Sequence, residues 1–343
     1  MDPREQIRKA FLEKNPLSIC GGGSKGFLNS APLPERKLHT TGMKGVLDYE
    51  PEELFIRARA GTPLQEIEDL LHKEQQMLPF EPPHFSSTAT LGGCIASGIS
   101  GPARPWRGAA RDYVLGCVLI NGKGERLRFG GEVIKNVAGY DVSRLQCGAF
   151  GTLGLLEELS IKTLPAPEQE LTLELELDQP RALERMQHWN RLPLPLSAAA
   201  WQQGKLRIRL SGTAVAVEQG RRHIGGEISS NTSYWQDLKE QRLKFFQNDK
   251  PLWRISLPRD CGPLKLPGDT LIDWGGAQRW LLSESSCQEL AAIAAGAGGY
   301  VSPFHAHSPV PLAPALLHLH QRLKNAFDPA GILNAGRLFA PSP

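Results

Sequence analysis

Hydrophobic and polar positions in the first half of the chain alternate between strand-like and helix-like patterns. Residues 54–60 predict a strand, and Thr62-Pro63-Leu-Gln65 predicts the start of a helix. Thr62 suits the cap, Pro63 suits the first helical position, and Gln65 completes a capping-box pattern. We expect the apolar face of this helix to consist of Leu64, Ile67, Leu70 and Leu71. Further strands are expected at 113–121, 125–129 and 154–164, the first two joined by a turn at 121–124. The segment therefore indicates a mixed domain of helices and strands.

The pattern changes after Pro165-Ala-Pro167. Residues 171–177 alternate strictly between leucine and a polar residue, which is typical of a strand with one buried face. Segments 187–191, 206–210 and 254–257 extend this into a small α+β unit, and apolar positions after residue 311 predict a helix that ends near 327–329. We therefore expect an α+β fold divided into residues 1–165, 166–310 and 311–343, with the last part returning to the first domain.

A glycine-rich run at 18–30 places a short apolar stretch directly before a loop that suits a phosphate. Its expected binding residues are Gly21, Gly22, Gly23, Ser24, Lys25 and Gly26. Glycines leave backbone N–H groups free to converge on an anion, while the serine adds a hydroxyl donor and the lysine adds charge. The expected ligand is a nucleotide pyrophosphate. For this run alone, a glycine-rich turn without a ligand stays an alternative.

Two better-known phosphate loops do not fit this run. Its glycines match the dinucleotide fingerprint G-x-G-x-x-G, but that motif must open a long helix, and Pro32 and Pro34 would interrupt one. The ATPase-type loop needs four residues between its first glycine and Gly-Lys-Ser/Thr, and that spacing is missing.

Two more blocks of small residues follow the first. One covers 89–101, and the other covers 133–145 and continues through 148–156. The first of these two contains too many glycines for a stable exposed helix, and it would let the backbone pack closely against something large and flat.

These three blocks together resemble the FAD-binding domain of the vanillyl-alcohol oxidase and p-cresol methylhydroxylase family, over residues 18–164. Within that family the chain is most similar to FAD-binding subunits of bacterial glycolate oxidases (glycolate dehydrogenases). The motifs that carry this similarity are 77–84, 101–106, 111–116, 135–141 and the tail 327–337, in which Ala335 stands where proline is usual. The resemblance implies a PCMH-type FAD-binding domain of two subdomains at 1–165, a smaller α+β cap or substrate/partner domain at 166–310, and a C-terminal helix and tail at 311–343.

The resemblance also implies which residues hold FAD between the two subdomains. The glycine loop would surround the pyrophosphate. The expected contacts to the ribityl chain and flavin are Thr90, Gly92, Gly93, Ser97, Gly98 and Ser100, and the third cofactor segment contributes Gly139, Tyr140, Asp141, Gly151, Thr152 and the backbone of Ile161. Lys135 and Asn136 are either cofactor contacts or structural. We expect non-covalent FAD, because no histidine or cysteine in the first loop matches a tethering position.

Three arginines surround Trp106: Arg104, Arg107 and Arg111. They suit a carboxylate substrate or a phosphate, and the alternative is a solvated surface loop. Arg111 is the preferred cofactor contact, because Asp112 beside it would orient the side chain. His84 is a proton-acceptor candidate, although a single loop histidine is more often structural.

Composition narrows the partners and the location. The chain has 39 Lys and Arg against 36 Asp and Glu without basic runs, so we expect no nucleic-acid partner. The first residues are charged where a secretory signal needs an apolar core, and no stretch approaches the roughly 18 apolar residues of a membrane span. We therefore expect a cytoplasmic protein, with any membrane association peripheral at the inner face or made through partners.

Cysteine and histidine spacing predicts neither a cluster nor a metal site. The six cysteines form no C-x-x-C pattern, so no iron–sulfur cluster is expected. We expect the cysteines to be buried, reduced thiols instead. His305 and His307 form one histidine pair. His318 and His320 lie two positions apart on a predicted helix and point in nearly opposite directions. Six of the seven tryptophans lie between 189 and 280, and we assign none of them to a site.

The function that the resemblance implies is that of an FAD-binding subunit of a glycolate oxidase complex, which oxidises a small 2-hydroxy acid, glycolate, to glyoxylate. Electrons would pass through a partner iron–sulfur subunit. The histidine- and glycine-rich catalytic segment of related flavoproteins is missing from 166–310. A separate catalytic flavoprotein subunit is therefore expected, and no catalytic residue is assigned here. Two alternatives stay open: a self-sufficient FAD-dependent oxidase or dehydrogenase of another hydroxy acid or alcohol, and a redox-silent assembly subunit.

Overall fold

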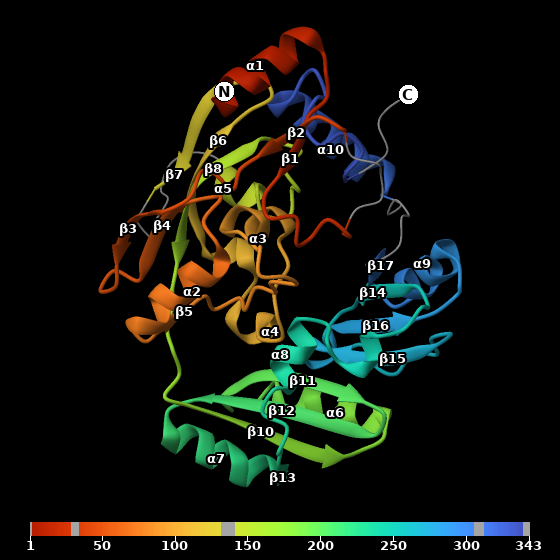
Figure 1. Cartoon of the computed structure of the whole chain (residues 1–343). Coiled ribbons are helices and arrows are strands. Elements are labelled where there is room, and N and C mark those ends of the chain that lie inside the picture. Colours follow the sequence, from red (N-terminus) through yellow and green to blue (C-terminus); the bar gives the residue numbers. More distant parts are fainter. Residues whose placement is uncertain (1, 29–33, 132–140, 305–311, 339–343) are drawn as a thin grey trace. The chain divides into compact units, whose positions relative to one another are not determined.

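The structure, a computed structural model, describes residues 2–28, 34–131, 141–304 and 312–338. The chain divides into two compact units, and each is described by itself. Unit 1 comprises Met1–Ile99, Ala109–Pro165 and Pro309–Pro343, and unit 2 comprises Ser100–Gly108 and Ala166–Ser308. The predicted α+β class is confirmed (Figure 1). The assignment of cap and FAD-binding roles to parts of the chain stays a prediction.

Unit 1 is built on a five-stranded antiparallel sheet with the order β3-β4-β8-β6-β7. Its strands are β3 (Val46–Glu50), β4 (Phe55–Arg59), β6 (Val114–Ile120), β7 (Arg126–Gly130) and β8 (Leu155–Lys162). The side chain of Asn121 fixes the β6–β7 turn, because its Oδ1 accepts hydrogen bonds from the N–H groups of Lys123 and Glu125, both at 3.0 Å. The predicted strands and this hairpin are confirmed.

Short helices complete unit 1. They are α1 (Pro3–Glu13), α2 (Leu64–Lys73), α3 (Leu91–Ser97), the 3-10 turn Ala110–Tyr113, α5 (Val142–Leu145) and α10 (Pro314–Phe327). Helix α3 contacts β4 and β8, so the second glycine block forms a helix after all. This helix is buried rather than exposed: Leu91, Gly92, Cys94 and Ile95 are all buried. Packing against the sheet overcomes the poor helix propensity of its glycines.

The start of α2 corrects one prediction. Helix α2 is present with Leu64, Ile67 and Leu71 buried, but Thr62 is not its cap. The hydroxyl of Thr62 instead donates to the carbonyl of Arg59 at 2.7 Å and accepts from the N–H of Gly45 at 2.9 Å. The tertiary contact with Gly45 therefore competes successfully with local capping.

Unit 1 also contains two small two-stranded sheets. Strand β1 (Ser18–Cys20) pairs in parallel with β2 (Lys37–His39), and β5 (Gln76–Met77) pairs with β9 (Leu164–Pro165). The tail after α10 joins the first of these sheets, because the N–H of Leu17 donates to Ile332 at 2.7 Å and the N–H of Asn334 donates to Leu17 at 3.0 Å. The tail therefore reaches the strand that leads into the glycine loop.

Unit 2 is an eight-stranded antiparallel sheet with the order β13-β10-β12-β11-β15-β16-β14-β17. Its strands are β10 (Gln169–Glu176), β11 (Leu196–Gln202), β12 (Lys205–Gly212), β13 (Glu227–Ile228), β14 (Leu252–Ser256), β15 (Asp269–Asp273), β16 (Gln278–Leu282) and β17 (Tyr300–Pro303). Its helices are α4 (Arg104–Arg107), α6 (Gln179–Trp189), α7 (Ala214–Ile224), α8 (Tyr234–Lys239) and α9 (Cys287–Gly296), with 3-10 turns at Lys244–Phe246 and Trp274–Gly276.

The alternation in β12 separates the two faces of this sheet. Leu206, Ile208 and Leu210 pack with α6 and α7 in one buried cluster. On the opposite face Arg207 lies over the ring of Tyr234 at 4.3 Å and Arg209 lies over Trp235 at 5.6 Å. Most of the indoles are core groups, as Trp189, Trp235, Trp253, Trp274 and Trp280 are each at most 7% exposed.

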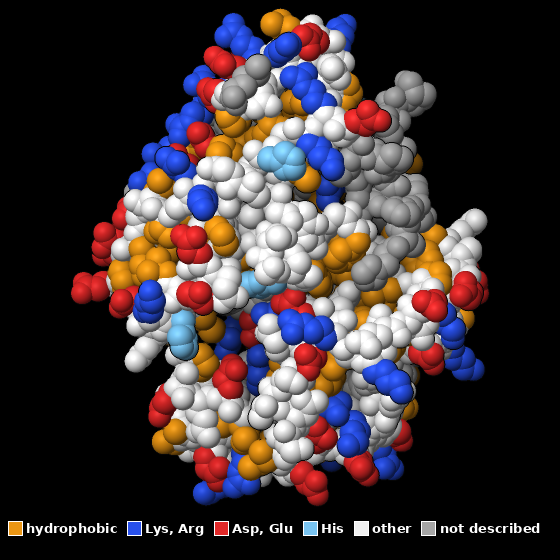
Figure 2. All heavy atoms as spheres, viewed as in Figure 1, with side chains coloured by type: hydrophobic (Ala, Val, Ile, Leu, Met, Phe, Trp, Pro, Cys, Tyr) orange, Lys and Arg blue, Asp and Glu red, His pale blue; other side chains and the backbone are white. Residues whose placement is uncertain are grey.

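No helix within the described residues is long and apolar enough to cross a membrane. Figure 2 shows positive and negative side chains interspersed over the face in view, with a row of Lys and Arg along the border at α1 and β7.

Candidate cofactor site

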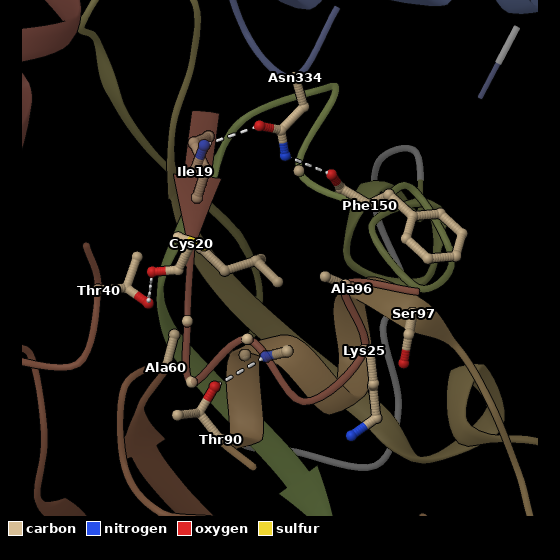
Figure 3. Close-up of a pocket in the computed structure, with 18 of the residues that line it drawn as sticks. Ile19, Cys20, Lys25, Thr40, Ala60, Thr90, Ala96, Ser97, Phe150 and Asn334 are labelled. Atoms are coloured by element: carbon tan, nitrogen blue, oxygen red, sulfur yellow. Dashed lines mark hydrogen bonds between the residues drawn. The ribbon is translucent and has the colours of Figure 1, made fainter. Parts of the chain in front are cut away.

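A pocket in unit 1 lies where the glycine loop, α3, the turn before β8 and the C-terminal tail converge (Figure 3). Its cavity volume is about 120 Å³, within a space of about 790 Å³ that includes open solvent. Its lining residues are Ile19, Cys20, Gly21, Gly22, Gly23, Ser24, Lys25, Gly26, Thr40, Ala60, Thr90, Gly92, Gly93, Ala96, Ser97, Phe150, Gly151, Gly154, Leu156, Asn334 and Arg337.

Two neighbouring glycines of the loop have different structural roles. A Cβ on Gly22 would lie 1.5 Å from the carbonyl oxygen of Thr88, whose hydroxyl donates to the Gly22 carbonyl at 2.5 Å. Gly22 is therefore required by packing within the protein. Gly23 has φ of +75°, and a Cβ there would meet no atom within 4 Å. Its missing side chain leaves open space at the pocket.

The N–H groups of the glycine loop and those at the start of α3 differ in whether they already have acceptors within the protein. At the start of α3, Leu91 donates to Thr62 at 2.9 Å, Gly92 donates to Ala60 at 2.7 Å, and Gly93 donates to the hydroxyl of Thr90 at 3.2 Å. By contrast, within the described residues no acceptor is recorded for the N–H groups of loop residues 21–24. The loop rather than the helix N-terminus therefore offers donors to a ligand.

The Lys25 side chain lies under the loop and is only 6% exposed. Its ammonium group donates to the hydroxyl of Ser24 and the carbonyl of His84, both at 3.3 Å, and lies 5.7 Å from the ring centre of Phe85. The imidazole Nε2 of His84 lies 2.8 Å from a Glu68 carboxylate oxygen. These contacts connect the ammonium of Lys25 to the loop around His84, and they give His84 a structural role there.

Asn334 joins three segments at the edge of the pocket. Its Oδ1 accepts from the N–H of Ile19 at 2.7 Å, and its Nδ2 donates to the carbonyl of Phe150 at 2.6 Å (Figure 3). Asn334 is 2% exposed and has φ of +44°, and Phe150 has φ of +51°. Left-handed backbone at a buried asparagine and a half-buried phenylalanine is uncommon and indicates that the surrounding contacts fix both residues.

Arg337 extends from the same tail to the glycine loop. Its guanidinium donates to the carbonyl of Lys25 at 3.4 Å and lies 5.3 Å from the ring centre of Phe150. Its Nε is buried and has no hydrogen-bond partner among the described residues. Burial lowers the pKa of the Arg337 guanidinium, and an electrostatic interaction with Cys20 opposes that shift.

A buried ion pair anchors the tail. The ammonium of Lys324 donates to Asp328 at 2.5 Å, to the Thr152 carbonyl at 2.8 Å and to the Leu333 carbonyl at 2.7 Å. Asp328 is fully buried and also accepts from the N–H of Leu333 at 2.7 Å. Burial lowers the pKa of Lys324, and the carboxylate of Asp328 opposes that effect.

The pocket brings together eleven of the residues proposed from sequence. These are Gly21, Gly22, Gly23, Ser24, Lys25, Gly26, Thr90, Gly92, Gly93, Ser97 and Gly151. Gly98 instead ends α3, where a Cβ would lie 2.9 Å from the backbone of Gly148. Ser100 belongs to unit 2, and Ile161 is fully buried in β8, paired with Ile56 and Val114. Gly139 and Tyr140 lie outside the described residues, as do Lys135 and Asn136.

Arg111, Asp141 and Thr152 line a second pocket of unit 1, with a cavity volume of about 490 Å³. Gly151 lines the first pocket and Thr152 the second, so the same turn borders both. Arg111 is exposed, and its Nε lies 3.9 Å from Asp112, which is too far for a hydrogen bond.

The other two arginines of the predicted set belong to unit 2. Arg104 lies over the ring of Trp274 at 4.4 Å. Arg107 donates to the hydroxyl of Ser211 at 2.5 Å and pairs with Glu170 at 3.3 Å.

Among the described residues no cluster of three histidine, cysteine, aspartate or glutamate side chains is arranged to hold a metal. His305 and His307 lie outside those residues, and His318 and His320 lie on α10. All six cysteines are free; Cys94 and Cys117 are buried, and the other four are partly exposed.

Sequence reasoning missed the contribution of the tail. Asn334 and Arg337 stand in the motif that supports the family resemblance, so a signal was present in the sequence. The sequence predicts that residues 311–343 return to the first domain, but nothing in the local pattern indicates that Asn334 and Arg337 reach a loop more than 300 residues earlier. Thr40, Ala60 and Phe150 were also missed, since they are ordinary residues that line the pocket through their position alone.

Comparison with known proteins gives the family. Residues 4–130 match the model of an FAD binding domain. The chain is 46% identical over 338 residues to the glycolate oxidase subunit GlcE of Escherichia coli K12, covering 98% of this chain and 96% of that protein. The chain belongs to the GlcE family. Its predicted cofactor, FAD, and its predicted class, FAD-dependent oxidoreductase, are confirmed at this level.

More distant relatives share part of the chain or the fold. The glycolate oxidase subunit GlcD of Bacillus subtilis is 35% identical over 133 residues, which is 38% of this chain and 28% of that protein. A solved alkyldihydroxyacetonephosphate synthase matches with a TM-score of 0.67 at 16% identity, over 97% of this chain and 73% of that one. The second similarity concerns the fold alone.

The residues of the pocket fit FAD. The pyrophosphate of FAD needs converging donors and positive charge. Among the described residues, the N–H groups of loop residues 21–24 and the Nε of Arg337 have no recorded partner. Open space at Gly23 permits close approach to the backbone.

Proposed function

We propose that this chain is the FAD-binding subunit of a glycolate oxidase complex and that it holds FAD non-covalently in the unit 1 pocket. The observation that supports this most directly is the loop of residues 21–24, which lines the unit 1 pocket and whose N–H groups have no recorded acceptor among the described residues, in a chain of the GlcE family. FAD bound there would supply a two-electron carrier to the complex, which oxidises a 2-hydroxy acid such as glycolate to glyoxylate.

The residues of this chain have distinct parts in that function. Residues 21–26 bind the phosphates through the backbone, and Asn334 holds β1 and the Phe150 turn in place. Ile19, Ala60, Ala96 and Leu156 give the pocket apolar walls that exclude water. We propose no catalytic residue in this chain.

The proposal includes partners. A second flavoprotein subunit carries the catalytic site for the hydroxy acid, and an iron–sulfur subunit receives the electrons, because this sequence lacks cluster-type cysteine spacing and a hydroxy-acid catalytic segment. The complex would lie in the cytoplasm, peripheral at the inner face of the membrane through its partners.

Co-purification from native cells tests this function. The full chain carrying an affinity tag should bring down a second flavoprotein and an iron–sulfur protein, and it should release its FAD on acid precipitation. The isolated chain should oxidise glycolate or D-lactate poorly, and activity with an artificial electron acceptor should appear only with both partners, at equal flavin occupancy.

Three results would contradict parts of the proposal. Flavin that stays on the acid-denatured chain refutes non-covalent binding. Reduction of the isolated chain's flavin by glycolate at the rate of the full complex makes this chain a self-sufficient enzyme. Flavin that no substrate bleaches, with all partners present, makes it a redox-silent assembly subunit.

A further inference from the structure

Among the described residues that line the unit 1 pocket, the side chains with a formal charge are all positive. Of the residues that line it, Lys25 and Arg337 carry positive charge, and none is aspartate or glutamate. A buried cation is stable only where an anion or several acceptors compensate for its lost hydration. The lining residues that the structure describes supply no carboxylate for that purpose.

The two cations differ in how the protein uses them. The ammonium of Lys25 donates to the Ser24 hydroxyl and the His84 carbonyl, so these contacts direct it toward the protein. Among the described residues, the guanidinium of Arg337 makes one long hydrogen bond, 3.4 Å to the carbonyl of Lys25, and its Nε is buried without a partner. An unmatched buried donor needs an acceptor that the chain itself does not provide.

The support around Arg337 is rigid. Asn334, three positions earlier, bonds to Ile19 and Phe150, and the aromatic ring of Phe150 lies 5.3 Å from the Arg337 guanidinium. Asp328 holds the same tail through Lys324 and the N–H of Leu333. The guanidinium is therefore held at the loop before a ligand arrives.

We propose that Arg337 is a pyrophosphate-binding residue of the FAD site, an anion contact that the C-terminal tail supplies to the N-terminal glycine loop. This inference rests on the proposed function of the pocket. Its geometric basis is the contact between Arg337 and the carbonyl of Lys25, which places the guanidinium at the loop where the N–H groups of residues 21–24 have no recorded acceptor among the described residues. A guanidinium fork binds a phosphate with two parallel hydrogen bonds, which a lysine cannot reproduce.

Three variants of the full chain test the proposal: Arg337→Met, Arg337→Lys and, as a matched control, Arg322→Met on the exposed side of α10. The dissociation constants of FAD and of ADP, which has a pyrophosphate but no flavin, are measured by titration of the flavin-free chain. Arg337→Met should raise the dissociation constants of FAD and of ADP by the same factor, about 10- to 100-fold. Arg337→Lys should raise both dissociation constants by about 3- to 10-fold. Arg322→Met should change neither constant.

The outcomes separate the inference from the proposed function. If the wild-type chain binds no FAD, the proposed function fails and the inference fails with it. If wild type binds FAD and Arg337→Met binds FAD and ADP equally well, only the inference is wrong. Loss of FAD binding with ADP binding unchanged would move Arg337 to the flavin and overturn the pyrophosphate assignment.

Folding is checked by the thermal transition of each flavin-free variant. Should Arg337→Met fail to fold, Arg337→Lys decides: weaker ADP binding at a wild-type transition supports the proposal, and wild-type ADP binding refutes it.

Discussion

The glycine loop of unit 1 and the arginine-rich sheet face of unit 2 place positive charge in different settings. In unit 1, Arg337 lies at a pocket with an Nε that has no partner among the described residues. In unit 2, Arg207 and Arg209 lie over aromatic rings of α8, and Arg207 also bonds to Glu174 at 3.0 Å. Within the described part of unit 2, the Nε of Arg254 is likewise buried without a partner, but the unpartnered Nε of Arg337 belongs to a side chain that lines the pocket of the glycine loop.

This difference shows that positive charge alone does not mark a site. Unit 2 has more buried arginines, and Arg279 is only 2% exposed, with its pKa lowered by burial to about 10. Its guanidinium nevertheless donates to the carbonyls of Gly276 and Cys261. A ligand site requires unmatched donors together with open volume, and glycine backbone supplies both more readily than long side chains.

Asp328→Ala should give the largest effect, and it should be confined to unit 1. The change leaves the buried ammonium of Lys324 without its carboxylate and releases the N–H of Leu333, which typically lowers the free energy of unfolding by about 3–5 kcal/mol. FAD affinity should fall as well, because the tail carries Asn334. Chemical denaturation and FAD titration measure both effects.

The control is Glu218→Ala in unit 2, which removes an exposed ion pair. If Glu218→Ala lowered the free energy of unfolding as much as Asp328→Ala does, the comparison would be contradicted.

Gly23→Val should give the next effect, a loss of FAD with most of the fold intact. Valine at φ of +75° strains the backbone by about 1–3 kcal/mol, and its side chain would occupy the open space at the pocket. We expect FAD affinity to fall by at least about 100-fold. Gly204 in unit 2 has φ of +83° and equally open surroundings. Gly204→Val should therefore lose similar stability and keep FAD. Unchanged FAD affinity in Gly23→Val would make the loop assignment wrong.

Glu174→Gln should give the smallest effect and depend on pH. Burial raises the pKa of Glu174, but hydrogen bonds from Ser229 and Arg207 and the charges of Arg207 and Lys205 outweigh it, so the pKa is below its ordinary value of 4.5. The ionised group therefore stabilises the fold above pH 4.5, and this is lost as pH falls through the folded-state pKa.

The difference in free energy of unfolding between wild type and Glu174→Gln should be below about 1 kcal/mol at neutral pH. It should shrink toward zero as pH falls from about 5 to about 3 in denaturation measurements. A difference that grows in acid would contradict the sign of the pKa shift.

The sequence carried most of the information about strands and about the loop, because both depend on local patterns. Alternation in residues 171–177 predicted β10, and the turn at 121–124 predicted the β6–β7 hairpin. Consecutive glycines marked residues 21–26, which all line the pocket. In each case a short window of residues determines the backbone conformation.

What the sequence did not show depends on contacts between distant segments. Thr62 has the residue type and position of a cap, but Gly45 and Arg59 take its hydroxyl. Residues 100–108 group with unit 2, although they stand between two segments of unit 1. Arg337 and Asn334 reach the pocket only because Asp328 and Leu17 fix the tail, which no local periodicity reveals.

The bond between Ile19 and Asn334 joins residues 315 positions apart, and this separation constrains the order of events during biosynthesis. The ribosome delivers the glycine loop early, yet the asparagine that secures it follows only after all of unit 2 has been translated. Until then, β1 lacks its partner in the tail, and the Phe150 turn lacks the donor that holds its carbonyl. Domains usually fold as their residues emerge. Here the first domain to begin must wait for the second to be made, so FAD is expected to load after translation rather than during it.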